Sequence, residues 1–272
     1  MVEFSINYLS LQQINPKIGV LTLSRKHAPK KKDQSSARSK VHQIHDDAND
    51  NVTHIKFNKK YKVNIIPRNL SQEEYYLELS NSNKRVVVAV GPAGTGKTLL
   101  AVLQAIKEYK EGTISKIILT RPTVSVANEQ IGFLPGTLNQ KMEPWTKPIF
   151  DIFEEYYSPK QVAEMLENNV LEIAPLAFLR GRTFKDAIII SDETQNTTPE
   201  QLKMLLTRMG EGSRVFVTGD INQTDIKGKN GLQDFIDRQT GKSRAISICH
   251  FGHKDIERDP IVAEVLKLYG EI

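Results

Sequence analysis

The chain has 272 residues, of which 39% are hydrophobic and 25% are charged, and its formal net charge is +5. This length suits one α/β domain with an appendage, and a core of this size needs no disulfide or structural metal. The single cysteine, Cys249, excludes an intramolecular disulfide and is typical of a reducing compartment. No stretch approaches the ~18 apolar residues of a membrane span, and the N-terminus lacks a signal-peptide pattern. We therefore expect a cytoplasmic protein without a membrane partner.

Positive charge is concentrated at the start of the chain, where residues 1–68 carry 13 Lys or Arg against 5 Asp or Glu. The polar and charged stretch over 24–50 offers little apolar surface to bury. We predict a basic, partly disordered N-terminal arm over 1–68, with an alternation over 52–66 that would suit a hairpin. Such an arm can contact nucleic-acid phosphates or remain a solvated tail, and the sequence leaves both open.

From residue 69 onward, apolar strand candidates alternate with helical stretches. The candidates are Arg85–Val90, Lys116–Thr120, Val170–Ala174, Ala187–Asp192, Arg214–Gly219 and Ala245–Phe251. This alternation predicts an α/β domain over 69–272, with a mostly parallel sheet covered by helices on both faces. In such sheets ligands bind at the carboxyl ends of the strands, and each motif below lies at such an end.

The segment after the first strand candidate matches G-x-x-x-x-G-K-[ST], the phosphate-binding P-loop. It consists of Gly91, Pro92, Ala93, Gly94, Thr95, Gly96, Lys97 and Thr98. The glycines let backbone N–H groups approach an anion, and the start of the following helix favours negative charge. Lys97 is expected on the β- and γ-phosphates, and the Thr98 hydroxyl on Mg²⁺. The motif therefore predicts a nucleotide with β- and γ-phosphates and Mg²⁺ as ligands.

Two carboxylates, Asp192 and Glu193, follow the apolar strand candidate that begins at Ala187. P-loop enzymes need an acidic residue at such a place to hold Mg²⁺, and Asp192 is the candidate. A neighbouring carboxylate that does not hold the metal can polarise the attacking water. Glu193 is therefore the candidate general base.

The next strand candidate ends in the polar segment Thr218–Gln223. Its tip is expected beside the γ-phosphate, where Gln223 would sense that phosphate and Asp220 would orient its neighbours. A plain Gly-Asp turn is the alternative interpretation. The two preceding motifs favour the sensor.

Taken together and in order, the motifs resemble those of the PhoH-like ATPases, the phosphate starvation-inducible proteins related to superfamily 1 helicase motor domains. The resemblance extends over roughly residues 67–270 and rests on Gly91–Thr98, Arg121-Pro122, Gly132–Gly136, Arg180–Thr183, Asp192–Thr198 and Thr218–Gln223. The chain departs from the family at Thr194, where Ala is usual. The resemblance implies a RecA-like P-loop NTPase core that binds and hydrolyses ATP with Mg²⁺. It also implies action on RNA or single-stranded nucleic acid as a ring-forming, often hexameric, helicase-like ATPase.

The resemblance also assigns roles near the nucleotide. Gln195 is expected near the γ-phosphate, and the segment from Pro67 to Tyr75 resembles the helicase adenine-recognition segment. Gln72 would bond the adenine edge bidentately. Tyr75 is either part of that base site or a helix-packing residue.

Two further residues are candidates for contact with nucleic acid. Arg121 lies where helicase-like domains touch the nucleic-acid backbone. Trp145 either stacks on a base or packs in the core or between subunits, and packing is the favoured interpretation.

An arginine from a neighbouring subunit would stabilise the transition-state charge in a ring-forming ATPase. Arg258 matches a family arginine, although Asp259 stands where His is usual. Arg180, Arg182 and Arg208 are its rivals for this role.

Two other functions remain open on the sequence. One is a nucleotide-gated nucleic-acid-binding module with negligible turnover, and the other is a small-molecule kinase. The sequence does not predict whether the partner is RNA or DNA, or whether the protein unwinds strands or only hydrolyses ATP.

Overall fold

The computed structural model describes residues 62–122, 138–239, 241 and 243–269. In this part of the chain, six parallel strands form one sheet in the order β3-β2-β4-β5-β1-β6. The strands are β1 (Val86–Val90), β2 (Lys116–Arg121), β3 (Leu171–Pro175), β4 (Ala187–Ser191), β5 (Arg214–Gly219) and β6 (Ile246–His250). Each predicted strand is present to within one residue at each end, which confirms the predicted parallel α/β architecture.

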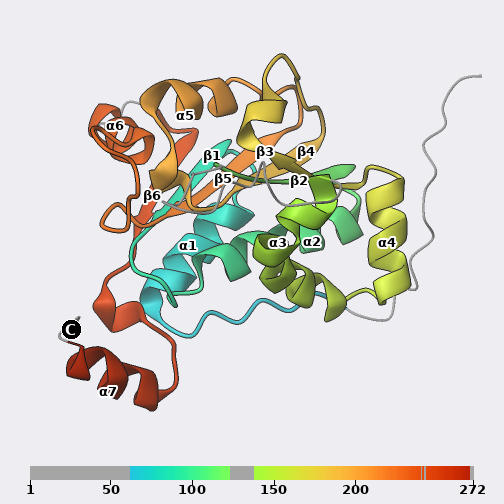
Figure 1. Ribbon diagram of the computed structural model, residues 1–272. Helices are drawn as coiled ribbons and strands as arrows, with labels where there is room; N and C mark the ends of the chain where they lie inside the picture. Colours follow the sequence, from blue (N-terminus) through green and yellow to red (C-terminus); the bar gives the residue numbers. More distant parts are fainter. Residues whose placement is uncertain (1–61, 123–137, 240, 242, 270–272) are drawn as a thin grey trace, which may run out of the picture. The chain divides into compact units, whose positions relative to one another are not determined.

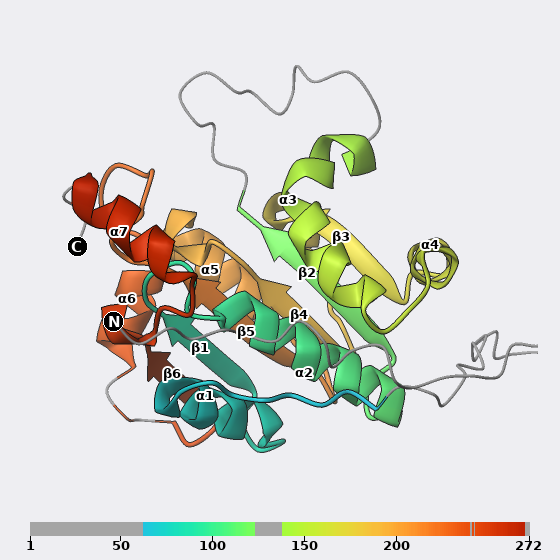
Figure 2. The same cartoon turned by 90° about the horizontal axis from the view of Figure 1, so that it is seen from below.

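Helices cover both faces of the sheet (Figure 1). The helices are α1 (Leu70–Ser80), α2 (Lys97–Glu111), α3 (Leu138–Glu154), α4 (Pro159–Glu167), α5 (Pro199–Leu206), α6 (Gly231–Arg238) and α7 (Pro260–Leu268). Figure 2 shows α1, α2 and α3 lying across one face, while α5 and α6 lie on the other. Because both faces are covered, β1 and β4 are buried along their whole length and read as continuous apolar runs rather than alternating ones.

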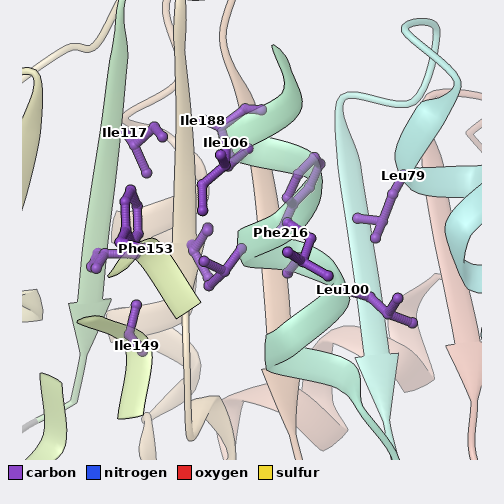
Figure 3. Packing of buried hydrophobic residues seen from close by; sticks show 14 of the residues in the cluster. Leu79, Leu100, Ile106, Ile117, Ile149, Phe153, Ile188 and Phe216 are labelled. Atoms are coloured by element: carbon purple, nitrogen blue, oxygen red, sulfur yellow. The ribbon is translucent and has the colours of Figure 1, made fainter. Parts of the chain in front are cut away.

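The core lies in two layers, one on each side of the sheet. On one side α2 packs onto the strands, with Leu100 and Ile106 against Ile188 and Phe216 (Figure 3). The other side buries the alternate strand residues under α5 and α6, with Leu202 and others in a second cluster. The sheet is therefore a rigid base for the loops at its carboxyl edge.

The start of α1 is fixed by Asn69, whose Oδ1 accepts a hydrogen bond of 2.9 Å from the Gln72 backbone N–H. This is the usual N-cap arrangement, which satisfies one of the free N–H groups of the first turn. Asn69 also faces residues from the other end of the chain, as described below. The cap thus fixes the residue at which α1 begins, beside the P-loop.

Residues 62–67, which precede α1, belong to no helix or strand, although Val63 and Ile65 are buried in the core beside Tyr75 and Leu79. Within the predicted hairpin over 52–66, the described residues 62–66 contain no strand. Residues 52–61 lie outside the described residues. The rest of the predicted arm and the segment 132–136 also lie outside them. Among the helices that the structure describes, none has the length and apolar character to cross a membrane.

Candidate functional site

The sheet order brings three predicted motifs to one place. Because β5 pairs with both β1 and β4, the P-loop, the tip of β5 and the acidic pair follow neighbouring strand ends. A cleft of about 210 Å³ opens between them. It is lined by Ala93, Gly94, Gly96, Lys97, Thr98, Leu99, Asp192, Glu193, Gly219, Asp220 and Gln223.

The P-loop has the backbone that its glycines predict. Gly94 and Gly96 have φ angles of 83° and 82°, which other residues adopt only with strain. The Lys97 ammonium is buried in the loop, where Nζ donates to the carbonyls of Gly91 and Pro92, both at 2.7 Å. Burial lowers the pKa of Lys97, although nearby carboxylates oppose this shift. Lys97 is thus a desolvated cation at the rim of the cleft, placed to exchange carbonyl oxygens for phosphate oxygens.

Asp192 joins three elements. Its Oδ1 accepts hydrogen bonds from Thr98 Oγ1 at 2.8 Å and from Thr218 Oγ1 at 2.6 Å. The sequence predicted the pairing of Thr98 with Asp192 but missed Thr218, whose hydroxyl beside the Gly-Asp tip was the available signal. A hydroxyl and a carboxylate oxygen side by side suit Mg²⁺, which takes few protein ligands and completes its shell with water and phosphate. No cluster of three or more His, Cys, Asp or Glu occurs among the described residues.

Glu193 has an unusual backbone. Its φ of 51° and ψ of 38° put a non-glycine residue in the left-handed region, a conformation that costs of order 1–3 kcal/mol. Its Oε2 accepts a 2.6 Å hydrogen bond from Gln195 Nε2, and the residue is among those that line the cleft. The predicted general base is therefore present at the cleft in a strained, held conformation.

Gln195 and Gln223 occupy different positions from those expected of two phosphate sensors. Gln195 is 1% exposed. Its amide bonds Glu193, the Gln223 carbonyl at 3.2 Å and the Asp220 N–H at 3.0 Å. Gln223 is among the residues that line the cleft. The structure thus places Gln223 at the cleft and Gln195 behind it.

Gln72 touches the P-loop. Its Nε2 donates to the Thr95 carbonyl at 3.1 Å, and its Oε1 accepts from the Arg68 N–H at 2.9 Å. Tyr75 has no exposed surface, and its ring packs edge-on against Phe251 with centroids 5.7 Å apart. Burial raises the pKa of Tyr75 far above its usual range. Of the two interpretations of Tyr75, this geometry supports helix packing and not a base site.

Arg258 lies against the P-loop of its own chain. A Cβ on Gly94 would collide with the Arg258 side chain, and the Glu257 N–H donates to the Gly94 carbonyl at 2.9 Å. The Asn69 side chain donates to Glu257 Oε1 at 3.0 Å and fixes the segment from the α1 side. Because β6 pairs with β1, the residues after β6 reach the P-loop of the same chain. Arg258 thus lies on the P-loop of its own chain, and its role toward a neighbouring subunit stays a prediction.

The rival arginines lie elsewhere. Arg182 forms an ion pair with Glu172, with NH2 at 2.8 Å from Oε2. Arg208 donates to the Met204 and Arg182 carbonyls at 3.0 and 3.1 Å. Arg180 is exposed after β3, away from the residues that line the cleft. Of the four, Arg258 alone touches the P-loop.

The two nucleic-acid candidates also separate. Arg121 ends β2, half-buried, at the same sheet edge as the acidic pair, since the Asp192 N–H donates to the Thr120 carbonyl at 3.0 Å. Trp145 lies on α3 and packs against the core cluster under that helix. This supports the packing interpretation of Trp145 and leaves Arg121 as the better placed of the two.

The fold and the loop together define the P-loop class of α/β proteins. The family described as PhoH-like protein matches residues 64–270. The chain belongs to that family, as the motifs led us to expect.

Known relatives agree with this assignment. A PhoH-like protein of Bacillus subtilis (strain 168) is 43% identical over 206 residues, which are 75% of this chain and 63% of the relative. Protein PhoH of Escherichia coli (strain K12) is 36% identical over 210 residues, 76% of this chain and 58% of the relative. The chain thus spans about three fifths of the length of these relatives.

A solved structure, the Sulfolobus solfataricus SWI2/SNF2 ATPase core in complex with dsDNA, is 16% identical and has a TM-score of 0.37. The likeness covers 58% of this chain and 33% of that chain. The assignment to the family does not depend on it.

Proposed function

We propose that this protein binds ATP with Mg²⁺ and hydrolyses it. The observation that carries the proposal is the junction at Asp192, where one carboxylate oxygen accepts from both Thr98 and Thr218 beside the Lys97 cradle. This junction joins the P-loop helix to the ends of β4 and β5. Such an arrangement suits a triphosphate and its metal ion, and it has no evident use in a plain strand-to-helix turn.

Each residue of the cleft has a separate task in this proposal. The P-loop N–H groups and Lys97 hold the phosphates, and Thr98 with Asp192 would hold Mg²⁺. When bound, Mg²⁺ supplies positive charge that offsets the charge developing on the phosphate oxygens. Glu193 orients the attacking water and accepts its proton, so that water adds to phosphorus as the bond to the leaving ADP oxygen breaks. Arg258, beside Gly94, supplies further positive charge from the same chain.

We also propose that RNA or single-stranded nucleic acid is the partner and that the protein assembles into rings. The excess of Lys and Arg in residues 1–68 supports a phosphate-rich partner, and Arg121 lies at the same sheet edge as the cleft. The exposed apolar residues Ile261, Val265 and Leu268 on α7 support self-association. Each chain carries one P-loop. In a ring, a neighbouring subunit would therefore take the place of a second ATPase unit.

The test measures phosphate release from ATP by the full chain, with Mg²⁺ or with EDTA. We expect steady release that needs Mg²⁺ and falls by at least ~100-fold in Asp192→Asn. Asp151→Asn, which removes an exposed carboxylate on α3, is the matched control and should leave the rate unchanged. Phosphate release that is equal in Asp192→Asn and the wild type would contradict the proposal.

Other outcomes decide between the remaining functions. ATP binding without release, with or without single-stranded RNA, would identify a nucleotide-gated binding module. Transfer of the phosphate to a small acceptor would identify a kinase. Fluorescence anisotropy with single-stranded RNA and DNA at several salt concentrations tests the partner, and sedimentation with and without ATP tests the ring.

A further inference from the structure

Gln195 sits at the centre of a closed hydrogen-bond network. A glutamine amide has two N–H donors, and both are used, on Glu193 Oε2 at 2.6 Å and on the Gln223 carbonyl at 3.2 Å. Its Oε1 accepts from the Asp220 N–H at 3.0 Å. With the side chain 1% exposed and both donors engaged, Gln195 would have to break one of these bonds to contact a phosphate.

The network fixes Gln195 from several sides. A Cβ on Gly219 would approach Gln195 Oε1 to 2.7 Å, so the amide packs directly on the tip of β5. That tip is tied to the P-loop, because the Gly91 N–H donates to the Gly219 carbonyl at 3.1 Å. The Gln195 carbonyl in turn accepts from Thr224 Oγ1 at 3.1 Å. Gln195 therefore links the acidic pair to the strand between it and the P-loop.

Glu193 needs such a support. Its left-handed backbone is strained, and the residue lines an open cleft. Within the described part of the chain, the Gln195 amide is its hydrogen-bond partner. A general base held by one strong hydrogen bond depends on that bond for its orientation toward the attacking water. A displacement of the base by about 1 Å can lower the rate ~10²-fold.

We propose that Gln195 is a positioning residue, which orients the Glu193 carboxylate and links that carboxylate to the tip of β5. In this proposal Gln195 does not contact the γ-phosphate. The inference rests on the proposed function, because it takes Glu193 as the general base. It replaces the phosphate-sensing role that the resemblance suggested for Gln195. Gln223, which is among the residues that line the cleft, keeps that role.

The decisive experiment is a double-mutant cycle on kcat, measured in single turnover with Mg²⁺ and ATP. Gln195→Met removes both donors at similar volume, and we expect kcat to fall roughly 10- to 100-fold with KM unchanged. Because Gln195 acts through Glu193, the double variant Gln195→Met/Glu193→Gln should be no slower than Glu193→Gln alone. Additive losses would overturn the proposal, and so would an unchanged kcat in Gln195→Met.

The chain offers a matched control. Gln104 on α2 is 3% exposed, and its Nε2 donates to Glu108 Oε1 at 2.8 Å, so it makes the same kind of buried amide–carboxylate bond away from the cleft. Gln104→Met should lower stability without changing kcat. A similar fall of kcat in both variants would show a general effect on packing and would overturn the proposal.

A binding measurement separates positioning from phosphate contact without using turnover. Titration calorimetry should give Gln195→Met the wild-type ratio of ATP to ADP affinity within about twofold, whereas loss of a γ-phosphate contact would lower it about tenfold or more. If Gln195→Met does not fold, Gly219→Ala displaces the same amide and takes its place in the cycle. A wild type that releases no phosphate would instead refute the proposed function, and this inference with it. An additive cycle in an active enzyme would refute this inference alone.

Discussion

Two buried cations at opposite ends of the sheet show how the molecule separates stability from function. Arg214 begins β5 and Lys97 follows β1, and their exposed fractions are close, at 5% and 8%. Arg214 pairs with Glu108 at 2.6 Å and donates to backbone carbonyls at and after the end of α1. Lys97 bonds neutral oxygens, and no described carboxylate forms an ion pair with it.

The difference follows from what a buried charge requires. A cation removed from water is stable when a carboxylate and further hydrogen bonds compensate it, and Arg214 has both. Lys97 has the hydrogen bonds without the carboxylate, and burial lowers its pKa. The charge of Arg214 is therefore fully compensated within the protein, whereas that of Lys97 lacks a compensating carboxylate, as expected if an anion occupies the cleft as proposed.

The largest expected effect comes from breaking the complete pair. Arg214→Met leaves the half-buried Glu108 carboxylate without its ion-pair partner and three backbone carbonyls without their donor, so we expect the free energy of unfolding to fall by about 3 kcal/mol. Urea denaturation measures it, and the double variant Arg214→Met/Glu108→Gln should recover part of the loss. A loss below about 1 kcal/mol would mean that the pair does not stabilise the fold.

A third cation, Arg258, sharpens the comparison because it is exposed yet touches the P-loop. Arg258→Ala should weaken ATP binding or turnover about 10- to 100-fold, as expected when a charge-assisted hydrogen bond is lost, while Arg180→Ala should change little. Since Arg258 lies on its own P-loop, a mixture of Lys97→Ala and Arg258→Ala subunits should release no more phosphate than the Arg258→Ala subunits release alone. Recovery of phosphate release on mixing would show that Arg258 acts on a neighbouring subunit.

The smallest effect is expected at the half-exposed pair of Glu172 with Arg182. The Arg182 hydrogen bond, aided by Lys116, lowers the pKa of Glu172 to about 2. A carboxylate with a lowered pKa adds stability that is complete above its unfolded value of about 4.5 and is lost as the pH falls towards about 2. Solvent screening at the exposed Arg182 keeps the gain near ~1 kcal/mol or less. Glu172→Gln should therefore flatten the pH dependence of thermal unfolding between about pH 5 and 2, and an unchanged curve would contradict this.

Local patterns were enough to predict much of the fold and the centre of the site. The strands are continuous apolar runs, and the P-loop and the acidic pair directly follow two of them, so their places at the carboxyl edge required no knowledge of the sheet order. The order itself could not be read along the chain. Thr218 was missed as a partner of Asp192 because the insertion of β5 between β1 and β4 is a long-range pairing.

The same limit explains the other differences. Arg258 reaches its own P-loop because β6 pairs with β1, across about 160 residues of sequence. Tyr75 is fully buried, but the apolar residues of α1 are not confined to one face, since Leu70 and Leu77 are exposed, so the pattern could not show which face packs. The position of Gln195 behind the cleft follows from its bonds to the tip of β5, and a motif cannot show these.

The most direct test of the central claim is titration calorimetry of ATP with Mg²⁺ against the wild type and Lys97→Met, with the unfolding free energy of both measured alongside. If Lys97 is a buried cation kept for an anionic ligand, Lys97→Met should bind ATP at least ~30-fold more weakly and be no less stable than the wild type. Undiminished affinity for ATP in Lys97→Met would contradict the account. So would a loss of stability like that expected for Arg214→Met.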